Sequence, residues 1–597
     1  MVNYMGDITD NERRKSAEAE YMRGVTYRAA MDGDRQANLE LAIACFKNAL
    51  EIYTLDVFPA EWARVLHELG KIYSDNDLSE TNREQNLRKA LSFFQASMEV
   101  YTREAFPVEW ARAQYQLGVT YTTLQMYDQQ LSLEKARACW LAALEIYTQE
   151  TFPSEWARIQ MRLGNLYCRL PGDDRRAFLK KAITYYEAAL TVFTREEFPE
   201  FWAMAQQCLG NVYAFLPTRQ REANLQKAIV HYQAALEVNT YEDFPRYWAD
   251  TMYALGDCYR NLPDDDEGQS NLKKAKEYYE AALRVYTCKD TPLDWAGVQR
   301  NLGVTYNLLQ EDDEQSRYGR AIACFQAALQ VYSYEDHPYE WARTHNMLGL
   351  TYLDLPGGDA QQHLQCAIES FEATLRIYTR EAFPLGWAAV QNTLGNSYNI
   401  LMSGDRQYNL TRAIACYDCT LHVYNRKAFP LEWARVQQNL GTAYSTLTEG
   451  EPQGMTYGPR ATHLQKAIEH YRAALLVYDK EETGQEWAET QSSLGDAYSS
   501  VPGNERQQDL ERAIACYEAA LQIYTREAFP LEWARMQNNL GNCYGEFARG
   551  DRQMRLRKAI DCYEGALQVF LSLHMDDLGQ RVEANLEKIY QVLQSGG

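Results

Sequence analysis

The chain has 597 residues, a formal net charge of −22 and a sequence pI near 5.0. This acidic balance disfavours nucleic acid and anionic membrane surfaces as partners, because both require a basic face on the protein. No apolar run reaches the ~18 residues that a membrane helix needs, so we expect no membrane insertion.

The N-terminal segment, Met1 to Arg14, is polar and charged and lacks the apolar core of a signal peptide. We therefore expect a cytoplasmic protein. Thirteen cysteines, most of them inside helical patterns, favour reduced thiols over a secreted disulfide framework. Residues 1–54 carry the repeat pattern described below without its tryptophan, which predicts an atypical first unit.

A tryptophan followed by alanine recurs along the rest of the chain. The successive steps are 48, 46, 46, 46, 47, 46, 46, 46, 54 and 46 residues. This regular period predicts a single array of repeats rather than separate domains. The series consists of Trp62, Trp110, Trp156, Trp202, Trp248, Trp295, Trp341, Trp387, Trp433, Trp487 and Trp533, with Trp140 outside it.

The unit from Phe383 to Tyr424 shows the first helix of each repeat. Pro384 suits a first helical turn, where its missing N–H is not needed. Trp387, Leu394 and Tyr398 follow at offsets of 7 and 11 residues. These offsets place the three side chains within about 20° of one another. The pattern predicts one apolar stripe and a core position for the tryptophans.

The second helix of this unit is predicted to begin at Asn409, a good N-cap residue, after a turn at 404–406. Gly395 in the first helix lets a neighbouring helix approach closely. Neither helix can bury its stripe alone, but stacked neighbours can bury both. The second stripe consists of Ala413, Tyr417, Thr420, Leu421 and Tyr424.

Leu-Gly-x-x-Tyr in the first helix and Ala-x-x-x-Tyr/Phe-x-x-Ala in the second resemble the signature of tetratricopeptide repeats. The resemblance extends from Met22 to Tyr590 and so covers almost the whole chain. The unit is longer than that family's usual ~34 residues. The positions that match the family's packing residues in the specimen unit are Leu394, Gly395, Tyr398, Ala413 and Tyr417.

Two phrases resemble the extended repeat arrays of filamentous bacteria, especially cyanobacteria. They are Tyr-Thr-Arg-Glu-Ala-Phe-Pro at 524–530 and Gly-Asp-Arg-Gln-x-Asn-Leu at 404–410. Such arrays often accompany CHAT peptidase domains or signalling NTPases, so the resemblance implies a regulatory association with one of these.

Anchor glycines from Gly24 to Gly541 define twelve units. The predicted fold is therefore all-α: a right-handed superhelical solenoid of twelve antiparallel helix pairs plus a C-terminal capping helix. We expect a single solenoid over 1–597, with the atypical unit at 1–54, regular repeats at 55–571 and the cap at 572–597. Eight extra residues between 446 and 463 predict a longer surface loop.

Catalytic motifs are absent from the sequence. There is no GxxxxGK[ST], HExxH or GxSxG, and the nine histidines are scattered. Cys416 and Cys419 form a CxxC at helix packing positions, with no second ligand pair nearby. The acidic runs at 264–267 and 311–314 lack the spacing of a calcium loop. We expect no catalytic residues, no metal site, no cofactor and no enzyme.

The first helices are expected to line a concave groove, as the tetratricopeptide resemblance implies. The position two residues after the tryptophan points away from the apolar stripe. Arginines there, next to amides, would suit a carboxylate-bearing or extended peptide. The candidate groove residues are Arg64, Arg112, Arg158, Arg343, Arg435, Arg535, Asn346, Asn392, Asn396, Gln438, Asn538 and Asn542.

Each of the six arginines also has a glutamate three residues earlier: Glu61, Glu109, Glu155, Glu340, Glu432 and Glu532. An ion pair along the helix would account for the arginines without a ligand. Both interpretations stay open at this point, and they are not exclusive.

These patterns favour a non-catalytic scaffold that binds a peptide or partner domain in its groove. One alternative is a regulatory or sensor subunit for a separately encoded CHAT-type peptidase or signalling NTPase. Another is a self-assembling structural protein, so a homo-oligomer is also considered. The partner is expected to be a protein or peptide.

Overall fold

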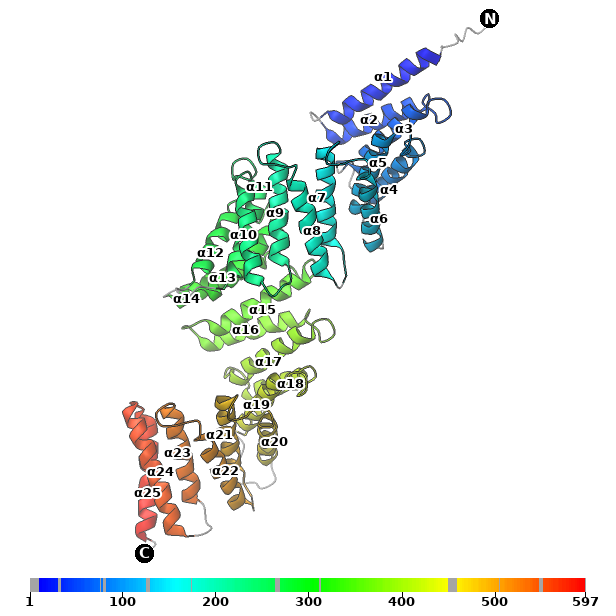
Figure 1. Ribbon diagram of the computed structural model, residues 1–597. Helices are drawn as coiled ribbons and strands as arrows, with labels where there is room; N and C mark the ends of the chain where they lie inside the picture. The colour runs from blue at the N-terminus through cyan, green and yellow to red at the C-terminus, as the bar shows by residue number, and fades with distance from the viewer. Residues whose placement is uncertain are drawn as a thin grey trace. The chain divides into compact units, whose positions relative to one another are not determined.

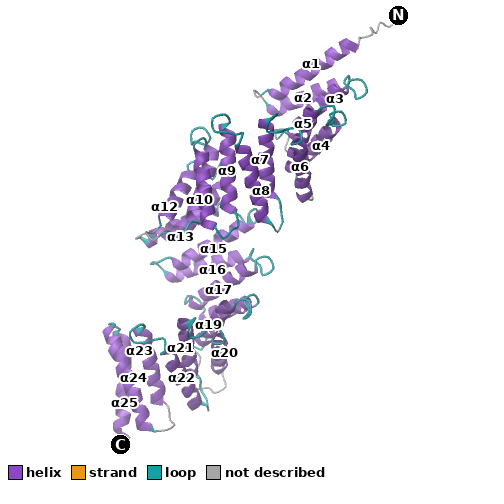
Figure 2. Ribbon diagram, in the orientation of Figure 1, coloured by secondary structure: helices purple, strands orange, loops and turns teal. Residues whose placement is uncertain are grey.

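A computed structural model describes residues 10–30, 34–75, 77–78, 82–124, 129–172, 174–263, 269–310, 313–448, 459–503, 505–546 and 551–595. Its described residues form helices and no strands (Figures 1 and 2). The chain divides into two compact units, Met1–Thr287 and Cys288–Gly597.

The first unit contains α1 (Asp10–Ala29), α2 (Arg35–Leu50), α3 (Pro59–Ser74), α4 (Arg83–Ser97), α5 (Pro107–Thr123), α6 (Gln129–Ala143), α7 (Pro153–Arg169), α8 (Arg175–Leu190), α9 (Pro199–Phe215), α10 (Arg221–Leu236), α11 (Pro245–Arg260) and α12 (Ser270–Ala282).

The second unit contains α13 (Pro292–Leu308), α14 (Glu314–Ala328), α15 (Pro338–Asp354), α16 (Ala360–Leu375), α17 (Pro384–Ile400), α18 (Arg406–Leu421), α19 (Pro430–Thr446), α20 (Pro459–Ala474), α21 (Gly484–Ser500), α22 (Arg506–Ala520), α23 (Pro530–Glu546), α24 (Arg552–Ser572) and α25 (Asp576–Ser595).

Each odd-numbered helix packs along the even-numbered helix that follows it, and α25 packs on α24. The predicted twelve helix pairs and the final single helix are therefore confirmed within the described residues. Pro384 begins α17 as expected, and most other first helices also begin at a proline. A proline at this position loses no helical hydrogen bond, because the first N–H groups have no partner in the helix.

The predicted N-cap of the second helix in the specimen unit is wrong. Helix α18 begins at Arg406, and the Asp405 side chain caps it by accepting the Tyr408 N–H at 3.1 Å. Asn409 is buried inside the helix and donates to the Leu401 and Ser403 carbonyls at 3.2 and 2.9 Å. Asn409 thus satisfies carbonyls at the end of α17 instead of starting α18, and Asp405 has the extended backbone that an N-cap needs.

An arginine at the start of most second helices binds the end of the helix before it. Arg406 Nη1 donates to the Leu401 carbonyl at 3.0 Å, and Arg175 Nη1 donates to the Cys168 carbonyl at 2.6 Å. Such a guanidinium satisfies carbonyls that have no helical partner and offsets the negative end of the helix dipole. Arg35, Arg83, Arg221, Arg460 and Arg506 make equivalent contacts.

An aromatic ring of each second helix lies directly over the anchor glycine of its partner. At Gly395, an added Cβ would meet Cε1 of Tyr417 at 2.7 Å, and the other eleven pairs show the same contact. No side chain larger than hydrogen fits there without moving a buried ring. The twelve glycines and rings are Gly24–Phe46, Gly70–Phe94, Gly118–Trp140, Gly164–Tyr186, Gly210–Tyr232, Gly256–Tyr279, Gly303–Phe325, Gly349–Phe371, Gly395–Tyr417, Gly441–Tyr471, Gly495–Tyr517 and Gly541–Tyr563.

The eleven tryptophans of the series are half-buried, so the prediction that they occupy the core overestimates their burial. The alanine that follows each of them is 0% exposed. Each tryptophan lies in the first turn of its helix, and an indole there is too large for its neighbours to cover completely. These fully buried alanines are Ala63, Ala111, Ala157, Ala203, Ala249, Ala296, Ala342, Ala388, Ala434, Ala488 and Ala534.

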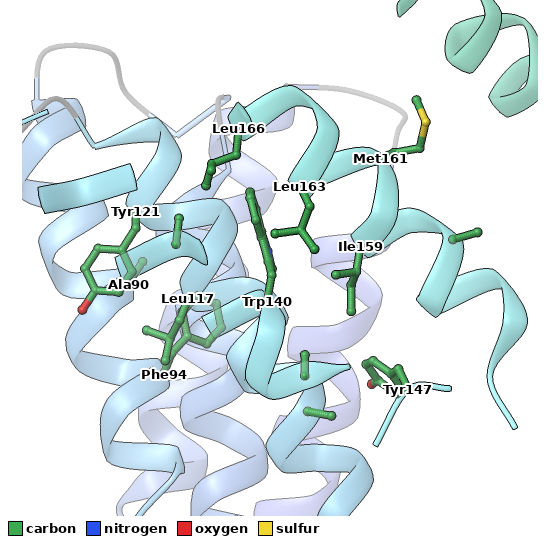
Figure 3. Packing of buried hydrophobic residues seen from close by; sticks show 14 of the residues in the cluster. Ala90, Phe94, Leu117, Tyr121, Trp140, Tyr147, Ile159, Met161, Leu163 and Leu166 are labelled. Atoms are coloured by element: carbon green, nitrogen blue, oxygen red, sulfur yellow. The ribbon is translucent and has the colours of Figure 1, made fainter. Parts of the chain in front are cut away.

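Trp140, the tryptophan outside the series, is the one that enters the core and is 1% exposed. It takes the place of the second-helix ring over Gly118 and donates through Nε1 to the Tyr115 carbonyl at 3.2 Å. Figure 3 shows its indole between Leu117 on one side and Leu163 on the other.

Two sequence predictions concern segments largely outside the described residues. The longer loop predicted at 446–463 includes residues 449–458, and the acidic runs include 264–267 and 311–312; none of these is described. Helix α20 begins after the first segment, at Pro459. No described helix is both long and apolar enough to cross a membrane.

Candidate partner-binding surface on the first helices

The six candidate arginines occupy the same position on six first helices, three in each unit. Arg112, Arg158, Arg343, Arg435 and Arg535 are exposed, and Arg64 is half-buried. This agrees with the expectation that the position points away from the apolar stripe.

None of the six arginines forms an ion pair with the glutamate three residues before it, as judged over the described ranges. Arg64 instead pairs with Glu18 of α1 at 2.5 Å, and Glu61 pairs with Arg14 at 2.6 Å. The remaining five arginines have no salt bridge among the residues that the structure describes. The pairing along the helix that the sequence allowed is not formed.

Some of the six arginines also contact an aromatic side chain. The guanidinium of Arg64 lies 4.0 Å from the ring centre of Tyr21, and that of Arg158 lies 4.9 Å from the ring centre of Phe201. Arg112 lies against the Tyr147 hydroxyl. Such stacking uses the face of the flat guanidinium group and does not consume its N–H donors.

Arg112 and Arg158 are brought together in a pocket of about 230 Å³ between α5 and α7. Lys71 of α3 adds a third cation, and Glu155 is the single carboxylate on the lining. Tyr115 and Tyr147 are among the aromatic walls.

Three other candidate residues line two pockets with mixed charge. Arg64 lines a pocket of about 590 Å³ together with Arg14 and three glutamates. Arg535 and Asn538 line one of about 380 Å³ beside Asp496, between α21, α23 and α25.

Two candidate amides serve the packing of the repeats. Asn396 Oδ1 accepts from the Tyr417 hydroxyl at 2.8 Å and from Asn439 Nδ2 at 3.0 Å. Asn542 Oδ1 accepts from the Tyr563 hydroxyl at 2.7 Å. Their acceptor atoms are thus already used, a role that the sequence interpretation missed.

The remaining amides differ in their contacts. Asn392 Oδ1 accepts from Asn439 Nδ2 at 3.4 Å, and Asn538 Nδ2 donates to Asn539 at 3.3 Å. Asn346 and Gln438 are half-buried.

His67 lies one turn from Arg64 and is 5% exposed. Burial, followed by the charges of Lys71, Arg112 and Arg28, lowers the pKa of His67 to about 3, so the ring is neutral at pH 7. Neither ring nitrogen has a hydrogen-bond partner in the described part of the chain.

All thirteen cysteines are free thiols. Burial raises the pKa of Cys416 to about 12, so this member of the CxxC is a protonated packing residue at neutral pH. Within the described ranges, no cluster of three or more His, Cys, Asp or Glu side chains could hold a metal ion.

Three arginines that the sequence interpretation missed, Arg162, Arg169 and Arg175, line a further pocket in the first unit. They come from two helices and from different repeat positions, so the periodic alignment does not group them.

The sequence matches no protein-family model and no curated protein. Among solved structures, it is similar to Cut9–Hcn1 of the APC/C, at 13% identity over 96% of each chain with a TM-score of 0.33. It is also similar to a STAND signal-transduction ATPase with a tetratricopeptide repeat sensor from Pyrococcus horikoshii, at 13% identity over 95% of this chain and 74% of that one, with a TM-score of 0.38.

A third similar structure is the human IFIT1 dimer with PPP-AAAA, at 14% identity over 86% of this chain and 95% of that one, with a TM-score of 0.33. TM-scores this low decide nothing about function.

Proposed function

We propose that this chain is a non-catalytic scaffold that binds an acidic peptide or an acidic segment of a partner domain along its first helices. The observation that carries the proposal is the set of six arginines at one repeat position, five of them exposed. Each has a glutamate within reach along its own helix, yet none is paired with it.

Five of these arginines keep donors that no described carboxylate occupies. A guanidinium binds a carboxylate through two parallel N–H bonds, and such bonds are stronger than those between neutral groups. Within the first unit, Arg112 and Arg158 lie on the consecutive first helices α5 and α7, a spacing that suits an extended chain with more than one acidic side chain.

The overall charge of −22 supports a protein partner over a nucleic acid, because a nucleic acid requires a broad basic face, whereas each unit offers only three of these arginines. A regulatory association with a CHAT-type peptidase or signalling NTPase would be a special case of this function. That association and self-assembly remain predictions from the sequence.

Selection of random displayed peptides on the purified chain tests the proposal. We expect enriched peptides to be acidic, and the double variant Arg112→Glu/Arg158→Glu to weaken their binding by at least about 100-fold, because each reversal removes one charged bond and adds a repulsion.

The matched control is Arg176→Glu/Arg219→Glu, which reverses two exposed arginines of the same unit, one on α8 and one in the turn before α10. It should leave binding unchanged, and both variants should keep the helical circular dichroism of the parent. Enrichment of neutral or basic peptides, or equal loss in both variants, would contradict the proposal.

A further inference from the structure

A pocket of about 420 Å³ opens in the first unit where α5, α7 and α9 end. Its floor is apolar and rigid: Trp140 and Tyr186 are each 1% exposed. Its rim carries Phe215, which is 72% exposed although it is a large aromatic side chain. The volume falls within the range of small-molecule sites.

Three guanidinium groups line this pocket, from Arg162 and Arg169 of α7 and Arg175 of α8. All three arginines are exposed, and none forms a salt bridge with any residue that the structure describes. Among the residues that the structure describes, no carboxylate lines the pocket. The described carboxylate next to Arg175 in sequence, Asp174, is occupied as the N-cap of α8.

Two amides add further donors. Asn165 Oδ1 accepts from the Tyr186 hydroxyl at 2.6 Å, and Asn211 Oδ1 accepts from the Tyr232 hydroxyl at 2.7 Å. With their acceptors used, the Nδ2 groups are what these side chains can still offer to a ligand.

The charge of Arg162 is unpaired because the repeat pattern is interrupted here. In two other repeats, the residue two before the anchor glycine donates to the amide or carboxylate of the preceding repeat, as Asn439 does to Asn396 and Asn539 to Asp496 at 3.0 and 2.9 Å. For Arg162 the corresponding residue of the preceding repeat is Val119, which cannot accept a side-chain hydrogen bond.

The other groups near the pocket do not cancel this positive charge. Burial raises the pKa of the Cys208 thiol to about 12 and also raises that of Cys168, so both remain uncharged at pH 7. Helix ends carry partial negative charge, but Arg175 and Arg221 already donate to the last carbonyls of α7 and α9.

We infer that this pocket binds a small oxyanion-bearing ligand with a flat apolar part. The oxyanion group, phosphoryl or carboxylate, is bound by the Arg162, Arg169 and Arg175 guanidinium groups, and the flat part lies on Phe215. Charge-assisted bonds of this type are the strong ones in proteins, and three guanidinium groups with no described carboxylate beside them favour an anion rich in acceptor oxygens. The inference does not depend on the protein-binding function, because it uses none of the six repeat-position arginines.

Isothermal titration calorimetry on the full chain in metal-free buffer tests this inference with three probes. Inorganic triphosphate carries phosphoryl groups without a ring, adenosine triphosphate carries both, and benzene-1,3,5-tricarboxylate carries carboxylates on a ring. We expect saturable binding of the phosphates or of the tricarboxylate, and this difference identifies the type of oxyanion.

The variant Arg162→Gln/Arg169→Gln should weaken binding about 100-fold, or about 10-fold for each guanidinium removed. Arg175 is left in place because it also caps α7. The matched control is Arg176→Gln, which removes an equal charge from an exposed residue of α8 outside the pocket and should bind like the parent.

Phe215→Ala should weaken the binding of whichever ring-bearing probe binds, adenosine triphosphate or the tricarboxylate. It should leave the binding of inorganic triphosphate unchanged. Absence of saturable binding for all three probes would overturn the inference, and so would an equal loss in Arg176→Gln. Neither outcome would bear on the acidic-peptide proposal, because that proposal is tested with different variants and a different ligand.

Discussion

The pairs α5/α6 and α17/α18 solve the same packing problem with different rings. In both, an aromatic side chain of the second helix lies over the glycine of the first. In α17/α18 the ring is Tyr417, whose hydroxyl donates to Asn396. In α5/α6 it is Trp140, whose N–H donates to a backbone carbonyl, and Val119 stands where Asn396 stands.

This difference follows a rule that holds in all twelve pairs. Where the ring is tyrosine, the residue after the glycine is a side chain that can accept its hydroxyl: Asn165, Asn211, Asp257, Asn396, Thr442, Asp496 or Asn542. Where the ring is phenylalanine or tryptophan, it is Val25, Lys71, Val119, Val304 or Leu350. A buried hydroxyl without an acceptor is costly, so the two positions vary together.

Replacing the anchor glycine with alanine tests the contact common to both pairs. This substitution should have the largest effect on stability. Gly395→Ala and Gly118→Ala should each destabilise their own helix pair by about 1–3 kcal/mol, because a buried ring must move. The loss should be larger at Gly118, where the added Cβ approaches the indole more closely. Hydrogen–deuterium exchange of the peptides in each pair measures it, since a solenoid opens locally.

The control is Gly319→Ala in α14, where an added Cβ meets nothing within 4 Å. Alanine there should stabilise the helix by about 0.5–1 kcal/mol through its better helix propensity. If Gly395→Ala behaved like Gly319→Ala, ring packing would not explain the anchor glycines.

Exchanging the hydroxyl and its acceptor tests the difference between the pairs. Asn396→Val alone should cost about 1–3 kcal/mol by leaving the Tyr417 hydroxyl without its acceptor, while Asn396→Val/Tyr417→Phe should recover most of that loss. A double-mutant cycle followed by local hydrogen exchange measures the coupling.

The reverse exchange uses α13/α14, which carry Val304 and Phe325. Phe325→Tyr should destabilise this pair, and Val304→Asn should rescue it. Additive effects in both cycles would mean that the rule has no energetic basis.

His67 of α3 and Asn392 of α17 occupy the same repeat position, but only His67 can take up a proton. This difference should give a smaller, pH-dependent effect on stability. The pKa of His67 is lowered from 6.5 to about 3, so the unfolded chain binds the proton first as the pH falls. Burial of His67 therefore does not lower the free energy of unfolding above about pH 6.5. Between about pH 6.5 and about pH 3 the fold loses stability progressively. At about pH 6 the loss should be about 1 kcal/mol.

Calorimetric unfolding onset at about pH 7 and at about pH 5 measures this loss. His67→Gln should reduce the shift between the two conditions, because glutamine takes up no proton. An unchanged shift in that variant would exclude His67 as its source.

The period, the helix pairs and the first-turn prolines could be predicted from the sequence, because each depends on local spacing. The N-cap of α18 could not, because Asp405 and Asn409 are both good caps and the contact of Asn409 with the end of α17 decides between them. The burial of Trp387 was overestimated because an angular stripe ignores how far a neighbouring helix extends.

Of the candidate site, only the exposure of its residues can be compared with the sequence; their binding of a partner stays a prediction. Exposure of the arginines followed from their angle on the helix. The bond between Asn396 and Tyr417 could have been found, because the joint variation of the two positions is visible in one chain. The Arg162 pocket depends on three first helices ending together, which the periodic pattern does not report.

Where a second helix begins with an arginine that binds the end of the preceding helix, the length of the turn between them matters little to the fold. Arg460 donates to the Thr448 carbonyl at 2.7 Å although the connecting segment is longer there than in other repeats. The hairpin is closed by this bond and by the ring over the glycine, both of which leave the intervening length free. These turns are thus natural points for gaining or losing sequence, and a reporter protein inserted between residues 448 and 459 should leave α19 and α20 intact.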